Sequence, residues 1–313
     1  MPKLPLPFLL LLGCLTRIAL CQPLHGTILV IDPGHGDRAW GEVPADPGAG
    51  ADTPAGRAWE CVFSWDTAMR LKELAEERGA TVLLTLEDPS GNYSPHDWNT
   101  ERIPQPGTPE FPYRRLVDIP RPQTVHQALY SRVLTANRIY RRYRWTHHVY
   151  FISLHFDSTN PEVAGISFYY PPWLEESEEV RVLSNSIRNK ERARKSLLTG
   201  AERGLAQRRH FAVLSLAENA NSFLVELGNI RSLNIDGSNP DLWRMRDPES
   251  RQAYAQLLVE ALEKMPKRPL PQGRNWKPAT AVILLFLLLL ARLRGTKRSR
   301  LESAEHGRDS QMP

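Results

Sequence analysis

The stretch TILVIDPGHG, residues 27–36, decides how the chain begins to fold. It opens with an apolar run rich in β-branched side chains, which predicts a buried strand. The strand ends at Pro33, and Gly34 and Gly36 permit a tight turn in which backbone segments approach closely. His35 therefore follows directly on the carboxyl end of a buried strand.

Strands and helices alternate downstream of this stretch. Apolar residues at helical spacing predict a helix over residues 59–78, and Gly79 ends it. Further helices are expected at about 124–144 (capped by Thr124), 176–197 and from Asp247 with Pro248 in first position, and further strands at 80–85, 148–154, 164–170, 211–216 and 222–227. This alternation predicts an α/β fold, in which a single domain over residues 22–265 has a mostly parallel central sheet with helices on both faces.

Residues 86–123 interrupt the alternation with a segment rich in Pro, Gly and Asn. Such composition predicts a long loop insertion on the surface. Two interpretations stay open for it: a lid or partner-docking loop, and a passive surface loop.

Polar side chains end three of the apolar strands. His35 follows the first strand, His155 ends the strand in YFISLHFDS, and Glu226 ends the strand in FLVELG. Because the carboxyl ends of parallel strands meet at one edge of a sheet, these side chains are expected to converge. Glu60 opens the helix that follows the first strand, so it is expected near the same edge.

Two imidazoles and one carboxylate make a typical catalytic zinc set, with one position left for water. His35, Glu60 and His155 are therefore candidate zinc ligands, and Glu226 is a candidate general base and acid. Taken singly, each residue has a plainer interpretation, such as a turn-capping histidine or a buried ion pair. Cys61 neighbours Glu60, but adjacent helical positions point about 100° apart, so Cys61 is predicted to be a core thiol.

These segments resemble the zinc-dependent N-acetylmuramoyl-L-alanine amidases, which cleave peptidoglycan between the muramic acid lactyl group and L-alanine. The matching residues occur in the family's order over about residues 27–265, and each short motif is weak by itself. They are Asp32-Pro33-Gly34-His35-Gly36, Asp46-Pro47-Gly48-Ala49, Glu60, Leu84-Thr85, Arg132 with Ala136 and Asn137, Ser153 with His155, Gly165 to Tyr169, and Val225-Glu226 with Gly228. The resemblance implies a Zn²⁺ cofactor, a peptidoglycan substrate, and metal-ligand and catalytic roles for the residues proposed above.

The chain departs from the family pattern around the expected cleft. An insertion separates His35 from Asp46, the 86–123 segment is longer than usual, and Asp157 stands where many members have Asn. After Gly228 the chain continues Asn-Ile-Arg-Ser instead of Phe-Ile-Ser-Asn. Two alternatives therefore stay open: a zinc hydrolase of another amide or peptide, and a non-catalytic cell-wall-binding protein on the same fold.

Both ends of the sequence predict export and a membrane tether. Residues 1–21 have a basic start and an apolar core, as a signal peptide has, although Leu-Leu-Gly-Cys14 also leaves lipidation open. Residues 266–277 form a Pro-rich linker before an uncharged run, 278–291, that would extend roughly 21 Å as a helix against a bilayer core of about 30 Å. Flanking basic residues extend such a run, so a transmembrane anchor is expected at 278–293 and a basic cytoplasmic tail at 294–313. The domain is then expected in the periplasm or cell envelope, anchored to the cytoplasmic membrane.

The net charge of +5 comes from the two ends of the chain, because residues 22–291 carry a formal charge near zero. A nucleic-acid partner is therefore not expected. Two Arg-rich stretches, 132–144 and 188–209, are interpreted as solvated helix faces, with contact to an anionic polymer as the alternative. The sequence leaves a protein activator open as a further partner.

Overall fold

The computed structural model describes the predicted domain and leaves out the predicted signal (1–21), anchor (278–293) and tail (294–313). The structure describes residues 22–37, 45–88, 103–119, 121–158, 164–175, 178–194, 206–208, 210–231 and 238–267. Within these residues, no helix combines the length and the apolar character needed to cross a bilayer. All the described residues belong to one compact unit.

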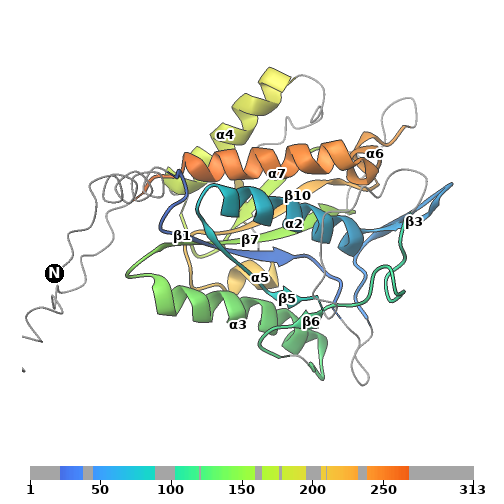
Figure 1. Ribbon diagram of the computed structural model, residues 1–313, viewed down its shortest axis with the longest axis horizontal. Helices are drawn as coiled ribbons and strands as arrows, with labels where there is room; N and C mark the ends of the chain where they lie inside the picture. The colour runs from blue at the N-terminus through green and yellow to red at the C-terminus, as the bar shows by residue number, and fades with distance from the viewer. Residues whose placement is uncertain are drawn as a thin grey trace, which may run out of the picture. The chain divides into compact units, whose positions relative to one another are not determined.

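A six-stranded sheet forms the centre of the domain, with strand order β4-β1-β7-β10-β8-β9 (Figure 1). The strands are β1 (Thr27–Pro33), β4 (Thr81–Leu84), β7 (His148–Asp157), β8 (Ser167–Tyr170), β9 (Ala206–Arg208) and β10 (Ser222–Asn229). β4, β1, β7 and β10 run parallel, whereas β8 is antiparallel to β10 and parallel to β9. The mostly parallel sheet predicted from the sequence is confirmed.

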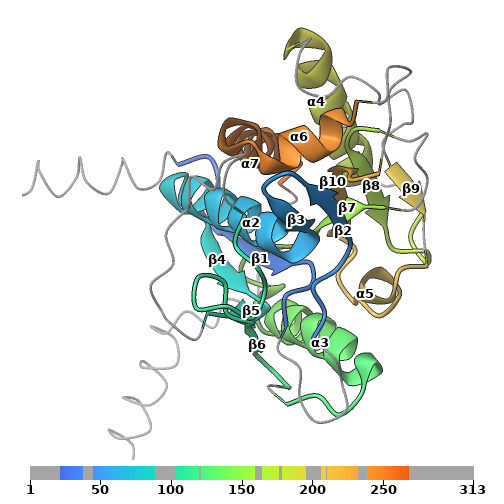
Figure 2. The ribbon, with the colours of Figure 1, turned by 90° about the vertical axis from the view of Figure 1, so that its right-hand side faces the viewer.

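Helices cover both faces of this sheet (Figures 1 and 2). One face carries α2 (Glu60–Glu77), α4 (Glu178–Arg194), α6 (Pro240–Arg246) and α7 (Pro248–Glu263), and the other carries α3 (Val125–Tyr143) and α5 (Ala212–Ser215). As predicted, Thr124 caps α3 by accepting from the Gln127 N–H, and Asp247 caps α7 by accepting from the Ser250 N–H.

The apolar run that opens the fold is buried on both sides because the sheet lies between two helical layers. Leu29 and Ile31 of β1 pack into the cluster shared with α2 and α7, whereas Ile28 and Val30 pack into the cluster shared with α3 and α5. Successive side chains of a strand alternate between faces, so a strand covered on both faces reads as a continuous apolar run.

Two short antiparallel hairpins flank the sheet. β2 (Gly50–Thr53) pairs with β3 (Gly56–Trp59), which leads directly into α2. β5 (Leu86–Glu87), at the start of the predicted 86–123 insertion, pairs with β6 (Arg115–Leu116), near its end. Neither hairpin was expected from the sequence.

Two predictions about local structure are wrong. The 86–123 segment is not a surface loop throughout, because Ile103, Phe111 and Leu116 are buried with at most 6% of their surface exposed. Its residues 89–102 lie outside the described part of the chain. The stretch 211–216, predicted as a strand, forms the short helix α5, whose Val213 and Leu214 pack under the sheet; its apolar run is too short for periodicity to distinguish the two.

Candidate metal centre

The four predicted site residues lie at the carboxyl edge of the parallel strands. His35 follows the end of β1, and His155 and Glu226 sit opposite each other in the register of β7 and β10. Glu60 is the first residue of α2. The convergence predicted from the strand ends is confirmed.

His35, Glu60 and His155 form a cluster in which one donor atom from each residue lies within 4.8 Å of the others. Glu60 bridges the two imidazoles: its Oε2 is 3.3 Å from Nε2 of His35, and its Oε1 is 2.9 Å from Nδ1 of His155. The imidazole rings are edge to face, with centroids 5.0 Å apart. Cys61 contributes no atom to this cluster and is 1% exposed in the core, as predicted.

The hydrogen bonds on the far side of each imidazole fix its tautomer. Ser153 donates its hydroxyl proton to Asp32 at 2.6 Å, so it can only accept from Nε2 of His155, which lies 3.1 Å away. Nδ1 of a neutral His155 then presents a lone pair to the carboxylate of Glu60. In the same way, Nδ1 of His35 lies 2.7 Å from Asp46, which directs the lone pair of Nε2 towards Glu60.

Three lone-pair atoms therefore face one another in a partly buried position, which is unfavourable unless a cation or a proton separates them. Two imidazole nitrogens and a carboxylate oxygen match the ligand preference of Zn²⁺. Burial opposes protonation of His35, but the charges of Glu60 and Asp46 outweigh it and raise the His35 pKa to about 10. Without a metal, a proton on His35 therefore balances the carboxylate charge at neutral pH, and the residues present fit a zinc ion.

Backbone contacts hold Glu60 and His35 in place. The N–H groups of Glu60 and Cys61, at the start of α2, donate to the carbonyls of Ala49 and Pro47, which tie this loop to the helix. The Ala49 N–H donates in turn to Oε2 of Glu60 at 3.0 Å. His35 adopts a left-handed φ of 62°, a strained conformation for a residue with a β-carbon.

Glycines leave the space that the imidazoles occupy. A β-carbon on Gly34 would lie 2.6 Å from the His155 ring, and one on Gly48 would lie 2.7 Å from Glu60 Oε2 and from the His35 ring. Both distances are shorter than van der Waals contact. The glycines of the two Asp-Pro-Gly segments are therefore needed for the donor atoms to meet.

Arg132 of α3 clamps the loop that carries His35. Its guanidinium group donates to Asp32 and Asp37, each at 2.7 Å, and to the backbone carbonyls of Pro33 and His35. Arg132 is only 3% exposed, so the prediction that the 132–144 stretch is a solvated face is wrong at this position. Asp32 also accepts from Thr85 and Ser153, which joins the ends of three strands.

Glu226 lies in β10 and is 9% exposed. Among the described residues, its Oε2 is buried without a hydrogen-bond partner. Burial and then the negative charges of Glu60 and Asp157 raise the pKa of Glu226 well above its ordinary value. The raised pKa makes the Glu226 carboxylate a stronger base than an ordinary glutamate, as suits a general base.

Sequence reasoning did not assign roles to Asp46, Asp32 and Arg132, which orient the ligands. They occur in the motifs quoted above, but a motif alone does not say which atom bonds to which. Two hollows were also not foreseen. One of about 230 Å³ lies beside the centre and is lined by Asp46, Leu129 and Arg132, among others.

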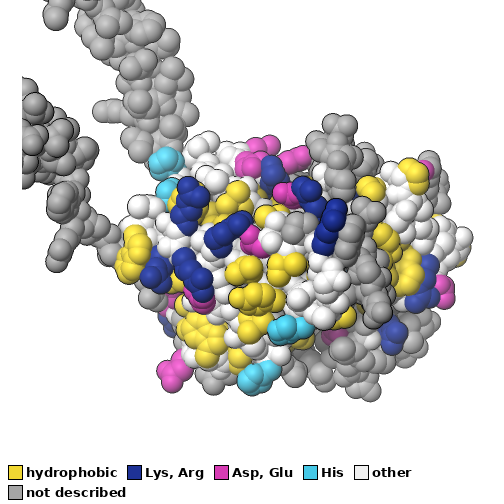
Figure 3. Space-filling view, turned by 90° about the horizontal axis from the view of Figure 1, so that it is seen from below, with side chains coloured by type: hydrophobic (Ala, Val, Ile, Leu, Met, Phe, Trp, Pro, Cys, Tyr) yellow, Lys and Arg dark blue, Asp and Glu magenta, His cyan; other side chains and the backbone are white. Residues whose placement is uncertain are grey.

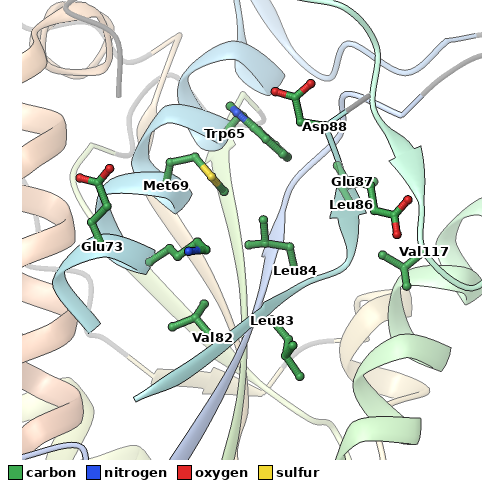
Figure 4. A pocket seen from close by; sticks show the side chains of 11 residues that line it. Trp65, Met69, Glu73, Val82, Leu83, Leu84, Leu86, Glu87, Asp88 and Val117 are labelled. Carbon is green, nitrogen blue, oxygen red and sulfur yellow. The ribbon is translucent and has the colours of Figure 1, made fainter. Parts of the chain in front are cut away.

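The second hollow is a groove of about 600 Å³ at the edge strand β4 (Figure 4). Trp65 and Met69 of α2 and Val82 of β4 line it, together with Leu86 and Val117. None of the four predicted site residues lines the groove, so it is separate from the metal centre.

The partly buried two-histidine, one-carboxylate set with a nearby carboxyl group is typical of a metal-dependent hydrolase. A family model described as N-acetylmuramoyl-L-alanine amidase matches residues 29–264. The chain belongs to this family, and its domain is therefore an amidase that acts on peptidoglycan. No curated protein sequence matches the chain.

Solved structures, two of them named as amidases, are similar to this domain. Cwp6 from Clostridium difficile is 19% identical with a TM-score of 0.51, over 77% of this chain and 30% of its own. Ami1 from Mycobacterium smegmatis is 22% identical (76% of this chain, 96% of its own, TM-score 0.49), and AmiC2 of Nostoc punctiforme is 20% identical (76%, 95%, TM-score 0.47). At this identity the likeness to Cwp6 shows the fold alone.

Proposed function

We propose that this amidase depends on zinc, which His35 (through Nε2), Glu60 and His155 (through Nδ1) hold, and that Glu226 is its catalytic base and acid. The observation that carries the proposal is the convergence of three lone-pair atoms, one from each residue. Asp46 and Ser153 fix the tautomers of the two imidazoles through hydrogen bonds. Bound zinc would polarise the amide carbonyl and lower the pKa of a water ligand.

The residues of the chain divide the remaining work. Asp46 and Ser153 keep the imidazoles oriented, and the buried Asp32–Arg132 pair keeps the loop of His35 against the strand ends. Glu226 takes a proton from the attacking water and transfers it to the leaving amine of L-alanine. Its raised pKa means that the carboxylate accepts a proton from the attacking water more readily than an ordinary glutamate would.

The proposal includes the site of action. The predicted signal at 1–21 and anchor at 278–293 would place the domain outside the cytoplasmic membrane, where peptidoglycan lies. An intracellular location of the full chain, established by protease accessibility in spheroplasts, would contradict this part and leave the chemistry untouched.

The chemistry is tested by zinc content and product release in one preparation. The purified chain should contain close to stoichiometric zinc and release stem peptides with a free N-terminal L-alanine from sacculi, identified by mass. His155→Ala should lose both zinc and release, whereas the surface variant Arg115→Ala should keep both. Zinc without release from sacculi, but with cleavage of soluble muropeptides or plain peptides, would favour another amide substrate. Full zinc with no cleavage of any of the three would favour the non-catalytic alternative, unless an added protein activator restores activity.

A further inference from the structure

The end of the domain opposite the metal centre is basic and aromatic. The last turn of α3 carries Arg141 and Arg142, and Arg144 and Trp145 follow. The Arg144 guanidinium lies over the Trp145 ring at 4.7 Å, and Trp145 is 54% exposed. Figure 3 shows Lys and Arg side chains gathered on the left of this view, next to apolar side chains.

Much of this positive charge is not neutralised. Arg141 pairs with Glu218, whereas no ion pair engages Arg142 or Arg144 within the described part of the chain. At the C-terminal end of α7, Lys264 and Lys267 are exposed. The acidic groups at this end include Glu218, Glu263 (paired with Arg78), Glu76 (paired with Lys72) and the exposed Glu77. We call Arg142, Arg144, Trp145, Lys264 and Lys267 the basic end.

Both ends of the described domain emerge at this place. The carbonyl of Gly26, just before β1, accepts from the His148 N–H at the start of β7, and Lys267 donates to the carbonyl of Pro23. Burial and then the charges of Lys267 and His147 lower the pKa of His148, so Lys267 lies close to the loop after α3.

The sequence beyond Lys267 limits how far this end can be from a membrane. Ten residues, 268–277, separate Lys267 from the apolar run at 278–291, and basic residues flank the run on both sides. A fully extended chain of ten residues spans at most about 36 Å. If the run enters a bilayer, the basic end is held within this reach of the lipid headgroups.

We propose that the basic end is a membrane-docking surface that binds anionic lipid headgroups, with Arg142, Arg144, Lys264 and Lys267 facing the phosphates and Trp145 at the interface. Surfaces that combine lysine and arginine with an exposed tryptophan are attracted to anionic bilayers and sit at the headgroup level. The inference rests on the proposed anchor and is independent of the zinc chemistry.

The consequence is a fixed orientation of the active site. His148 begins β7 and His155 lies seven residues further along the same strand, which is roughly 23 Å at the rise of a β-strand. Docking through the basic end therefore turns the metal centre away from the bilayer. The enzyme would bind peptidoglycan strands at a fixed distance from the membrane.

Hydrogen exchange of the full chain in lipid nanodiscs tests the inference. The amides of Arg144, Thr146, His147 and His148 are all hydrogen-bonded, so they exchange through local opening that a docked membrane would suppress. We expect their exchange to be about tenfold slower in discs containing phosphatidylglycerol than in discs of phosphatidylcholine alone. Amides of the central strand, 149–154, report whether each variant is folded.

Charge reversal supplies the matched comparison. Arg142→Glu with Arg144→Glu should remove the difference between the two kinds of disc, whereas Arg57→Glu with Arg115→Glu should keep it. Equal exchange in both discs, or a difference that survives the reversal at 142 and 144, would overturn the inference while leaving the anchor intact. A full chain that does not enter either disc would overturn both the anchor and the docking surface, and the zinc content of that same preparation reports on the chemistry separately.

Discussion

His155 presents Nδ1 to Oε1 of Glu60 at 2.9 Å. The opposite nitrogen of the imidazole is engaged by Ser153, whose own proton goes to Asp32. The relationship joins the carboxyl end of β7 to the first turn of α2 through two atoms that both offer lone pairs. A metal ion between the two atoms removes the repulsion of their lone pairs, which is why the site is expected to respond to metal.

Zinc binding should release protons. Because Glu60 and Asp46 raise the His35 pKa to about 10 against the opposing effect of burial, His35 of the metal-free protein is protonated at neutral pH. We expect binding at pH 7.5 to release about one proton from His35, measured by titration calorimetry in buffers of different ionisation enthalpy. Zinc affinity should rise with pH up to about 10, and a pH-independent affinity would contradict the assigned protonation.

The same shift predicts how metal-free stability depends on pH. A pKa raised from its ordinary value near 6.5 to about 10 means that protonated His35 stabilises the folded state. This contribution is fully present below pH 6.5 and is lost as the pH rises through 10. In the metal-free protein, His35→Ala should therefore weaken or remove a fall in urea-unfolding free energy between these values.

Asp46 should control zinc affinity without being a ligand. Its Oδ2 accepts from Nδ1 of His35 at 2.7 Å and so fixes which nitrogen faces the centre. Asp46→Ala is expected to lower zinc affinity about 10- to 100-fold, as loss of a ligand-orienting hydrogen bond does. Asp52→Ala, at an 84% exposed carboxylate of the neighbouring hairpin, is the control and should leave affinity unchanged. Competition with a chromogenic chelator measures both.

Alanine substitutions at two glycines should distinguish the cost of backbone strain from that of a steric clash in the metal centre. Gly26 and Gly48 have nearly the same left-handed φ, 75° and 73°, but a β-carbon on Gly26 meets nothing within 4 Å. Gly26→Ala should cost about 1 kcal/mol of unfolding free energy and leave zinc binding intact. Gly48→Ala should additionally lose zinc, because its methyl group would lie 2.7 Å from Glu60 Oε2 and the His35 ring. Equal zinc content in the two variants would show that the loop yields at little cost.

The sequence predicted the residues of the metal centre better than the residues that orient them. His35, His155 and Glu226 follow apolar strands, and parallel strands must bring their carboxyl ends to one edge whatever the details of packing. Asp46 and Arg132 act through hydrogen bonds over loop and helix, and no periodicity in the chain encodes those distances. The stretch 211–216 was predicted as a strand because its apolar run is too short for periodicity to distinguish a strand from a helix. Phe111 was placed on the surface because Pro- and Gly-rich composition indicates irregular backbone, and irregular backbone is not always exposed.

Arg132 should contribute more to the free energy of unfolding than an exposed arginine of the same helix does. It holds Asp32 and Asp37 in a buried cluster and donates to two backbone carbonyls, which a lysine cannot do with one ammonium group. Arg132→Lys keeps the charge but leaves some of these buried acceptors without a donor, and is expected to cost about 1–3 kcal/mol. Arg138→Lys, at a side chain 59% exposed and paired with Asp118, should cost about 0–1 kcal/mol. Urea unfolding of the zinc-free proteins compares them, and equal costs would contradict the clamping role of Arg132.

Glu226 should be separable from the metal ligands by its effect on rate alone. Glu226→Gln removes the titrating group while keeping its size, and in the described residues the Oε2 atom that it alters has no hydrogen bond to lose. We expect zinc content and stability to stay close to those of the original chain, and kcat for release of stem peptides to fall about 10²- to 10⁴-fold, the range for loss of a general acid and base. Glu87→Gln, at an exposed glutamate, controls for the chemistry of substitution. If Glu226→Gln lost zinc, the residue would be a ligand; if it kept full rate, the proton would be transferred by another group, and Asp157, whose charge already raises the Glu226 pKa, would be the next residue to change.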